Sequence, residues 1–174
     1  MAKNEPYKEQ YVREQYRRIT TALIEKHLMI TTMESCTSGL IASLITDTEG
    51  ASSIMKGACI TYSNEAKVAA GVPAEVIMQH GVYSEETARA MAKAAADQFH
   101  ADLAIGVTGS FQNADPANKD SIPGEIYYAI SFRGTITSHQ CQLPPLQSRP
   151  DAKLYVAGLV ADALLTLLQD LLLS

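Results

Sequence analysis

Residues 29–39 read Met29-Ile30-Thr31-Thr32-Met33-Glu34-Ser35-Cys36-Thr37-Ser38-Gly39. The branched and bulky side chains at 31–33 favour extended backbone, because they fit the surface of a pleated sheet. The small residues at 35–39 favour a tight turn, and the apolar segment 40–45 that follows has the length and composition of a helix. We therefore expect a buried strand that runs through a turn into a helix.

A turn of small residues at the carboxyl end of a strand is where open α/β sheets bind ligands. Free backbone N–H groups and the positive end of the helix favour an anion or a developing oxyanion there. An ordinary helix cap built from serine and threonine is the alternative interpretation. Spacing within the stretch leaves both interpretations open.

The rest of the chain has the composition of a globular α/β protein. It has 174 residues, of which 47% are hydrophobic and 19% are charged, enough for one domain with a substantial core. No internal repeat or linker interrupts it. We predict a single domain over residues 1–174, with residues 1–8 as a loose tail.

Composition also excludes several classes of function. The net charge of −5 lacks the basic stripe of a nucleic-acid surface, so no nucleic-acid partner is expected. No run of 18 uncharged apolar residues occurs, which predicts no membrane partner, and the polar start predicts no signal peptide. Three scattered cysteines fit reduced thiols in a cytoplasmic protein, and no Cys or His pair has the spacing of metal ligands, so no metal is expected: Cys36, Cys59 and Cys141.

Hydrophobic periodicity and turn residues predict an alternation of helices and strands. Helices are expected at 10–26, 37–47, from 64, at 74–80, after a cap at 84 and at 149–172, and strands at 28–34, 54–62, 102–108, 124–132 and 135–143. The last two strands form a hairpin that turns at 133–134, so the sheet is expected to be mixed. Because helix 149–172 is apolar nearly all round, we expect deep packing on the sheet or a subunit contact, hence a homo-oligomer.

A second candidate for chemistry follows the strand at 54–62. Asn64 is the predicted N-cap of the next helix, which puts Lys67 in the first turn, where a cation opposes the helix dipole. Residues that break a local rule are candidates for function, and the dipole and burial would both favour the neutral amine that a general base needs. Tyr62 could direct its hydroxyl into the same cleft. An exposed lysine and a tyrosine at the edge of the core are the alternatives.

Two long motifs resemble the CinA C-terminal domain family, whose usual forms are ESCTGG and VTYSNEAK. They are Glu34-Ser35-Cys36-Thr37-Ser38-Gly39 and Ala58-Cys59-Ile60-Thr61-Tyr62-Ser63-Asn64-Glu65-Ala66-Lys67. Shorter matches follow in the family's order, and the resemblance covers roughly residues 15–170. They are Gly71-Val72-Pro73, His80-Gly81-Val82-Tyr83-Ser84, Ala101-Asp102-Leu103-Ala104, Val107-Thr108-Gly109 and Pro123-Gly124-Glu125-Ile126-Tyr127.

The resemblance implies a three-layer α/β/α sandwich and, for active members, a nicotinamide-nucleotide amidase of pyridine-nucleotide salvage. Such an enzyme hydrolyses nicotinamide mononucleotide to nicotinate mononucleotide and ammonia and requires no cofactor. Ser35 would attack the carboxamide carbon, Lys67 would take its proton, and Tyr62 would help to place or relay that proton. The expected partner is thus a small-molecule nucleotide substrate. The resemblance places substrate contacts in the turn, at a later strand end and at a late arginine: Thr37, Ser38, Gly39, Thr108, Gly109 and Arg149.

The chain departs from the family at two places. Ser38 replaces a glycine, and the loop that normally reads GIAGPxGG begins Gly109-Ser110-Phe111-Gln112-Asn113-Ala114-Asp115. This loop, 109–123, has no glycine after its first residue, so it offers few positive-φ positions for a phosphate cradle, while Asp115 and Asp120 would repel an anion. The alternatives to an amidase are therefore a non-catalytic or substrate-shifted paralogue with a rewritten ligand loop, or a competence-related interaction protein.

Overall fold

The computed structural model describes residues 7–111, 118 and 121–173, and the side chains of 170–173 are not described. Most of the predicted tail, and both Asp115 and Asp120, lie outside the described residues. Within the predicted tail, the Tyr7 ring packs against Tyr11 and Tyr155, and its hydroxyl donates to Asp162 at 2.5 Å.

The described strands form one mixed sheet in the order β2-β1-β3-β4-β5. The pairs β1–β2 and β1–β3 are parallel, whereas β3–β4 and β4–β5 are antiparallel, as predicted for a hairpin added to a parallel sheet. The carboxyl ends of β1 and β3 therefore lie at the same edge of the sheet. The strands are β1 (Ile30–Glu34), β2 (Cys59–Ile60), β3 (Leu103–Gly109), β4 (Glu125–Phe132) and β5 (Thr135–Gln142).

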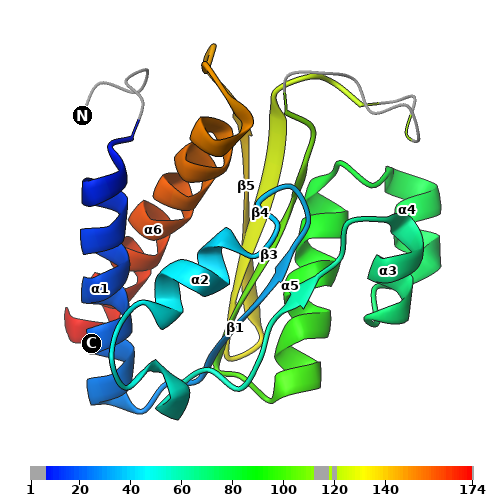
Figure 1. Cartoon of the computed structure of the whole chain (residues 1–174). Coiled ribbons are helices and arrows are strands. Elements are labelled where there is room, and N and C mark those ends of the chain that lie inside the picture. The colour runs from blue at the N-terminus through cyan, green and yellow to red at the C-terminus, as the bar shows by residue number, and fades with distance from the viewer. Residues whose placement is uncertain (1–6, 112–117, 119–120, 174) are drawn as a thin grey trace.

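Helices cover both faces of the sheet, which gives the expected three layers (Figure 1). One layer contains α1 (Glu9–Lys26), α2 (Leu40–Thr46) and α6 (Arg149–Leu173), and the other α3 (Asn64–Ala69), α4 (Ala74–His80) and α5 (Glu85–Phe99). Every residue of β3 is buried. A strand covered on both faces reads as a continuous apolar run, which is the pattern that predicted it.

The α1–α6 layer explains why helix α6 is apolar nearly all round. The predicted stripe of α1 is fully buried and joins the α6 residues in one core with the sheet: Val12, Tyr16, Ile19, Leu23, Val156, Val160 and Leu164. The Tyr16 hydroxyl donates to the Ala157 carbonyl at 3.0 Å, which fixes the two helices against each other. Deep packing is thus confirmed, and a homo-oligomer stays a prediction.

Helix α5 approaches β3 closely at Gly106. A Cβ on this residue would lie 2.2 Å from the Ala88 carbonyl oxygen, so a larger residue would push the helix away from the sheet. The predicted cap of α5 is confirmed, because the Ser84 hydroxyl accepts from the Thr87 N–H at 3.1 Å. This packing places the amino end of α5 at the same sheet edge as the turn after β1.

The predicted strand 54–62 is wrong over most of its length. Ala51–Ser53 forms a 3-10 turn, and only Cys59–Ile60 pairs with β1. The apolar Ile54 is buried in the core beside the start of β1, where its carbonyl accepts from Ile30 at 2.8 Å. Gly57 then passes against the Phe99 ring, where a Cβ would lie 2.4 Å away. Apart from Ile54, the apolar residues of this run are half-buried or exposed, with Ile60 at 59% and Tyr62 at 60%, so the run forms neither a long strand nor a buried face.

The predicted cap of α3 is also wrong. Ser63, not Asn64, is the N-cap, because its hydroxyl accepts from the Ala66 N–H at 3.1 Å. The Asn64 amide instead donates to Asn118 at 3.1 Å. Since α3 is a short helix, Lys67 lies in its last turn, where a cation suits the dipole. The dipole argument for Lys67 therefore fails, although its burial holds.

Candidate active site

Glu34, the last residue of β1, organises the turn that follows. Its buried carboxylate accepts from the N–H groups of Gly39 at 2.9 Å, Ile41 at 3.2 Å and Ala42 at 2.8 Å, and from the Thr32 hydroxyl at 3.0 Å. It thus caps α2 from the preceding strand, where an anion meets the positive helix end. This contact holds the intervening residues 35–38 in a fixed turn.

Two residues of this turn have positive φ angles: Gly39, which adopts them without strain, and Ser38, which does not. Gly39 has φ +88°, and a Cβ there would lie 2.9 Å from the Ile60 side chain. Ser38, at φ +52°, also adopts the left-handed conformation, which costs a non-glycine residue about 1 kcal/mol or more. A glycine, as in the motif this segment resembles, would relieve that strain.

The turn brings Ser35 to the amine of Lys67. The Lys67 Nζ lies 3.1 Å from the Ser35 Oγ and 2.9 Å from the Thr61 carbonyl oxygen. Ser35 is 6% exposed and Lys67 only 1%. Burial disfavours the charged ammonium form, and a neutral amine at this distance can accept the hydroxyl proton. Two segments distant in the sequence therefore form one buried hydroxyl–amine pair.

Tyr62 lies five residues before Lys67 in the sequence, but its hydroxyl contacts Arg149. Its side chain is 60% exposed, and its hydroxyl accepts from the Arg149 guanidinium at 2.9 Å. The same guanidinium lies 5.1 Å from the centre of the Phe111 ring, which is buried in the core. Tyr62 and Arg149 thus form a bridge between the end of β2 and the start of α6. The Tyr62 hydroxyl thus contacts Arg149, and the expected relay from Tyr62 to Lys67 stays a prediction.

Only part of the turn has backbone donors available. The Ser38 N–H donates to the Ser35 carbonyl at 3.0 Å, and that of Gly39 to Glu34. Among the described residues, the N–H groups of Cys36 and Thr37 make no backbone hydrogen bond, and they lie toward the Cys36 sulfur, where they partly offset the rise that burial causes in the pKa of its thiol. The amides that could stabilise an oxyanion beside Ser35 are therefore those of Cys36 and Thr37, whereas the expected contacts from the Ser38 and Gly39 amides are used within the turn.

Thr108 and Gly109 lie where predicted, at the carboxyl end of β3 beside Ser35, whose N–H donates to the Val107 carbonyl at 2.9 Å. The Thr108 hydroxyl donates to the Val82 carbonyl at 2.9 Å, so it anchors the segment before α5. A Cβ on Gly109 would lie 2.7 Å from the Glu125 carbonyl oxygen, so glycine is required by the neighbouring strand.

Cys36, directly after Ser35, could compete for the role of nucleophile. Burial, together with the charge of Glu34, raises the pKa of its thiol to about 12. Only a thiolate is a strong nucleophile, and almost none is present near neutral pH. Of the two neighbouring side chains, the Ser35 hydroxyl is therefore the better candidate nucleophile.

We predict that Cys36 resists alkylation. At pH 8, iodoacetamide should modify Cys36 at least about 100-fold more slowly than a free cysteine, because the thiol is buried and protonated. Peptide mass spectrometry after timed labelling measures this rate, with the less buried Cys59 as the internal comparison. Labelling of Cys36 as fast as that of a free cysteine would contradict the prediction that its thiol is buried and protonated.

Two buried hydroxyls at the site lack partners. Among the described residues, the buried side-chain nitrogen and oxygen atoms without a hydrogen bond are Thr37 Oγ1 and Thr61 Oγ1. Leaving such a group unpaired costs about 1–3 kcal/mol. Both belong to segments that contact the Ser35–Lys67 pair. Thr37 is one of the substrate contacts expected from the sequence, whereas Thr61 is not among them.

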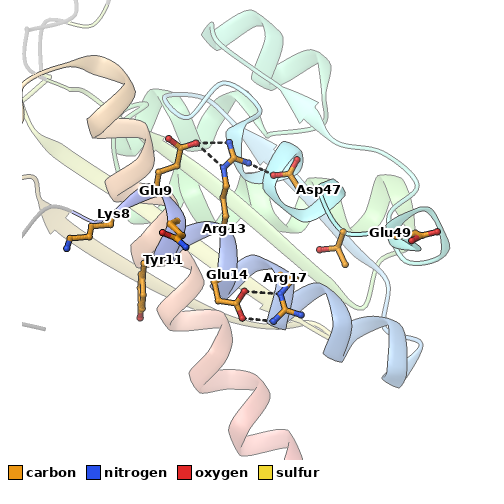
Figure 2. A pocket seen from close by; sticks show the side chains of 10 residues that line it. Lys8, Glu9, Tyr11, Arg13, Glu14, Arg17, Asp47 and Glu49 are labelled. Carbon is orange, nitrogen blue, oxygen red and sulfur yellow. Dashed lines mark hydrogen bonds and ion pairs between the residues drawn. The ribbon is translucent and has the colours of Figure 1, made fainter.

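A wide hollow elsewhere on the surface has a different character. It has a volume of about 1170 Å³ and lies between the start of α1 and the end of α2 (Figure 2). Its charged side chains pair with one another, since Arg13 contacts both Glu9 and Asp47, and Arg17 contacts Glu14. These side chains are about half exposed, so the pairs are solvated and contribute little energy.

The described residues contain no cluster of three or more His, Cys, Asp or Glu side chains that could hold a metal ion. No helix in the described part of the chain combines the length and apolarity needed to cross a membrane.

The fold and the site define an α/β protein with a buried serine–lysine pair at the carboxyl edge of a mixed sheet. Residues 13–170 match the CinA C-terminal domain family, and the chain belongs to that family.

Individual relatives agree with this assignment. A CinA-like protein from Citrifermentans bemidjiense is 40% identical over 119 residues, which is 68% of this chain and 28% of that protein. The chain thus spans under a third of the length of such relatives. The crystal structure of competence/damage inducible protein CihA from Agrobacterium tumefaciens is 30% identical with a TM-score of 0.81, over 90% of this chain and 94% of that one. A CinA superfamily protein from Klebsiella pneumoniae shares the fold, with a TM-score of 0.83 at 24% identity over 91% of this chain and 98% of that one.

Sequence reasoning placed Ser35 and Lys67 together but missed two participants. Glu34 is an isolated carboxylate at the end of an apolar strand, and its position directly before the turn could have indicated a cap. The Thr61 carbonyl carries no signal in the sequence, because every residue has one. Only the path of the chain reveals that it holds the lysine amine.

Proposed function

We propose that this chain is a serine amidohydrolase that hydrolyses nicotinamide mononucleotide to nicotinate mononucleotide and ammonia. The observation that carries the proposal is the buried contact of 3.1 Å between Ser35 Oγ and Lys67 Nζ. Membership of the CinA C-terminal domain family supports it. The resemblance of both motifs to those of nicotinamide-nucleotide amidases supplies the substrate.

In the proposed mechanism, Ser35 Oγ attacks the carboxamide carbon while its proton passes to Lys67 Nζ. The Cys36 and Thr37 N–H groups hold the oxyanion. Lys67 then delivers the proton to the amide nitrogen, the C–N bond breaks, and ammonia leaves an ester on Ser35. Water hydrolyses this ester with Lys67 again as the base. The Thr61 carbonyl, 2.9 Å from Nζ, directs one N–H away from the reaction and orients the amine.

Recognition of the nucleotide is assigned to the bridge formed by Tyr62 and Arg149. The guanidinium is exposed at the edge of the site and is already oriented by the Tyr62 hydroxyl and the Phe111 ring. Such a fork can bind a phosphate through paired N–H donors. Phe111 departs from the family motif, but its ring is buried under Arg149, so it supports the guanidinium from below.

A substrate-shifted or non-catalytic relative is the second candidate, because loop 109–123 differs from the glycine-rich sequence of the family. Under this alternative the serine–lysine pair is retained while the nucleotide is bound poorly or replaced by another ligand. The two candidates differ in whether the nucleotide is bound and turned over.

An ammonia-release assay with nicotinamide mononucleotide tests the proposal. We expect turnover by the unaltered chain and a loss of about 10³-fold or more in Ser35→Ala, because the covalent step is removed. Ser53→Ala is the matched control, since Ser53 is an exposed serine in the 3-10 turn. Its activity should equal that of the unaltered chain.

The outcomes separate the candidates. Turnover that persists in Ser35→Ala contradicts the serine mechanism. A folded chain that neither releases ammonia nor gains thermal stability from the nucleotide contradicts the amidase and favours the second candidate.

A further inference from the structure

Thr61 combines two features at the buried amine. Its carbonyl oxygen accepts from Lys67 Nζ at 2.9 Å, which places the residue beside the base. Its hydroxyl is on the same residue, which is 3% exposed, and has no hydrogen-bond partner among the described residues. A buried polar group is normally paired, so an unpaired hydroxyl on the residue whose carbonyl holds the amine points to a small polar ligand.

The proposed reaction contains a step that needs such a ligand site. After ammonia leaves, a water molecule must attack the carbonyl carbon of the ester on Ser35. Its oxygen forms the new C–O bond, and one of its protons passes to Lys67 Nζ. As the bond from carbon to Ser35 Oγ breaks, Lys67 returns the proton to that oxygen, and the carboxylic acid is released. The second O–H of the water needs an acceptor close to Nζ.

We propose that the Thr61 hydroxyl holds this hydrolytic water and that Thr61 is a positioning residue for the second half-reaction. The inference rests on the proposed function. It assigns two tasks to one residue: the carbonyl orients the amine in both half-reactions, and the hydroxyl orients water in the second one only. Removal of the hydroxyl should therefore slow hydrolysis of the ester without slowing its formation.

The chain offers suitable variants. Thr61→Val keeps the shape of the side chain and the backbone carbonyl and removes only the hydroxyl. Because that hydroxyl has no hydrogen-bond partner among the described residues, its loss leaves none of their polar groups unsatisfied, and the variant should fold. Thr61→Ser restores a hydroxyl. Thr20→Val is the matched control, since Thr20 is a buried threonine on α1 whose hydroxyl donates to Ile45.

The experiment uses p-nitrophenyl acetate, an activated ester that can acylate Ser35 whatever the natural substrate is. Release of p-nitrophenol with enzyme in excess measures acylation, and the decay of acetylated protein by intact mass spectrometry measures deacylation. We expect Thr61→Val to slow deacylation about tenfold or more, because misplacement of a reactant has effects of this size. Its acylation rate should stay within about twofold, and Thr61→Ser should recover most of the deacylation rate.

Three results would count against the inference. Unchanged deacylation in Thr61→Val overturns it, and so does an equal loss in both steps, which would show that Thr61 acts through the placement of Lys67. A similar loss in Thr20→Val would reduce the effect to general destabilisation and also overturns it. If the unaltered chain shows no acylation that depends on Ser35, the proposed function fails first and the inference with it. That result is recognised because the unaltered chain and Ser35→Ala then react with the ester at the same rate.

Discussion

Replacement of Lys67 by methionine is expected to lower the rate of ammonia release by about 10³-fold or more. The amine lies 3.1 Å from Ser35 Oγ and the residue is 1% exposed, so the variant removes the proton acceptor from a site shielded from bulk water. The thermal unfolding midpoint should be equal or higher, because an apolar side chain of similar length replaces a buried polar group. Steady-state kinetics and circular dichroism measure the two effects on the same sample.

Lys93→Met is the control for this variant. Lys93 is an exposed lysine on α5, paired with Asp97 at 2.6 Å, and its loss should leave the rate within about twofold. Reactivity of Ser35 toward a fluorophosphonate should fall together with turnover in Lys67→Met, since both require removal of the serine proton. Full activity of folded Lys67→Met would remove the lysine from the mechanism.

Replacement of Glu34 by alanine is expected to have the largest effect on stability. The carboxylate accepts hydrogen bonds from three backbone N–H groups of the turn and α2 and from Thr32, all at 3.2 Å or less. Loss of this acceptor leaves buried donors unsatisfied, which we expect to cost about 3–5 kcal/mol. Urea unfolding followed by circular dichroism measures the change.

Two further variants test whether the loss of stability in Glu34→Ala comes from the lost cap of α2. Glu34→Gln keeps the length of the side chain but turns an amide NH₂ toward N–H donors, so its stability should fall between those of Glu34→Ala and the unaltered chain. Glu14→Ala removes an exposed carboxylate paired with Arg17 and should leave the free energy of unfolding nearly unchanged, because solvent screens the pair. If Glu34→Ala costs no more than Glu14→Ala, then Glu34 does not cap α2 in solution.

Much of the fold could be predicted because its elements follow strong local patterns. The stripe of α1 at Val12, Tyr16 and Ile19 and the buried run of β3 appear in the structure as expected. The segment 54–62 could not be assigned from its pattern, because its apolar residues mostly neither pair as a strand nor lie in the core, and Ile60 and Tyr62 are exposed. In the folded chain only Cys59 and Ile60 run beside β1, opposite Met33 and Glu34.

The sequence predicted which segments carry the site residues, but it did not predict the hydrogen-bond partners of those residues. The two motifs place Ser35 and Lys67 at strand and helix ends, and the parallel sheet brings those ends together. The partner of Tyr62 could not be predicted, because Arg149 is 87 residues away along the chain. The cap of α3 differed because Ser63 and Asn64 are both good capping residues, and the contact of Asn64 with Asn118 depends on the folded chain.

The amino-acid sequence by itself determined the order of helices and strands, the mixed sheet and the segments that carry the serine and the lysine. These properties depend on side-chain periodicity and turn chemistry, which act over a few neighbouring residues. The tertiary structure alone decided that Glu34 caps α2, that Tyr62 pairs with Arg149, and that Thr61 holds the lysine amine. Each of these contacts joins groups that only the packing of the sheet and helices brings together. Hydrogen bonds form where that packing places a donor and an acceptor within about 3 Å of each other.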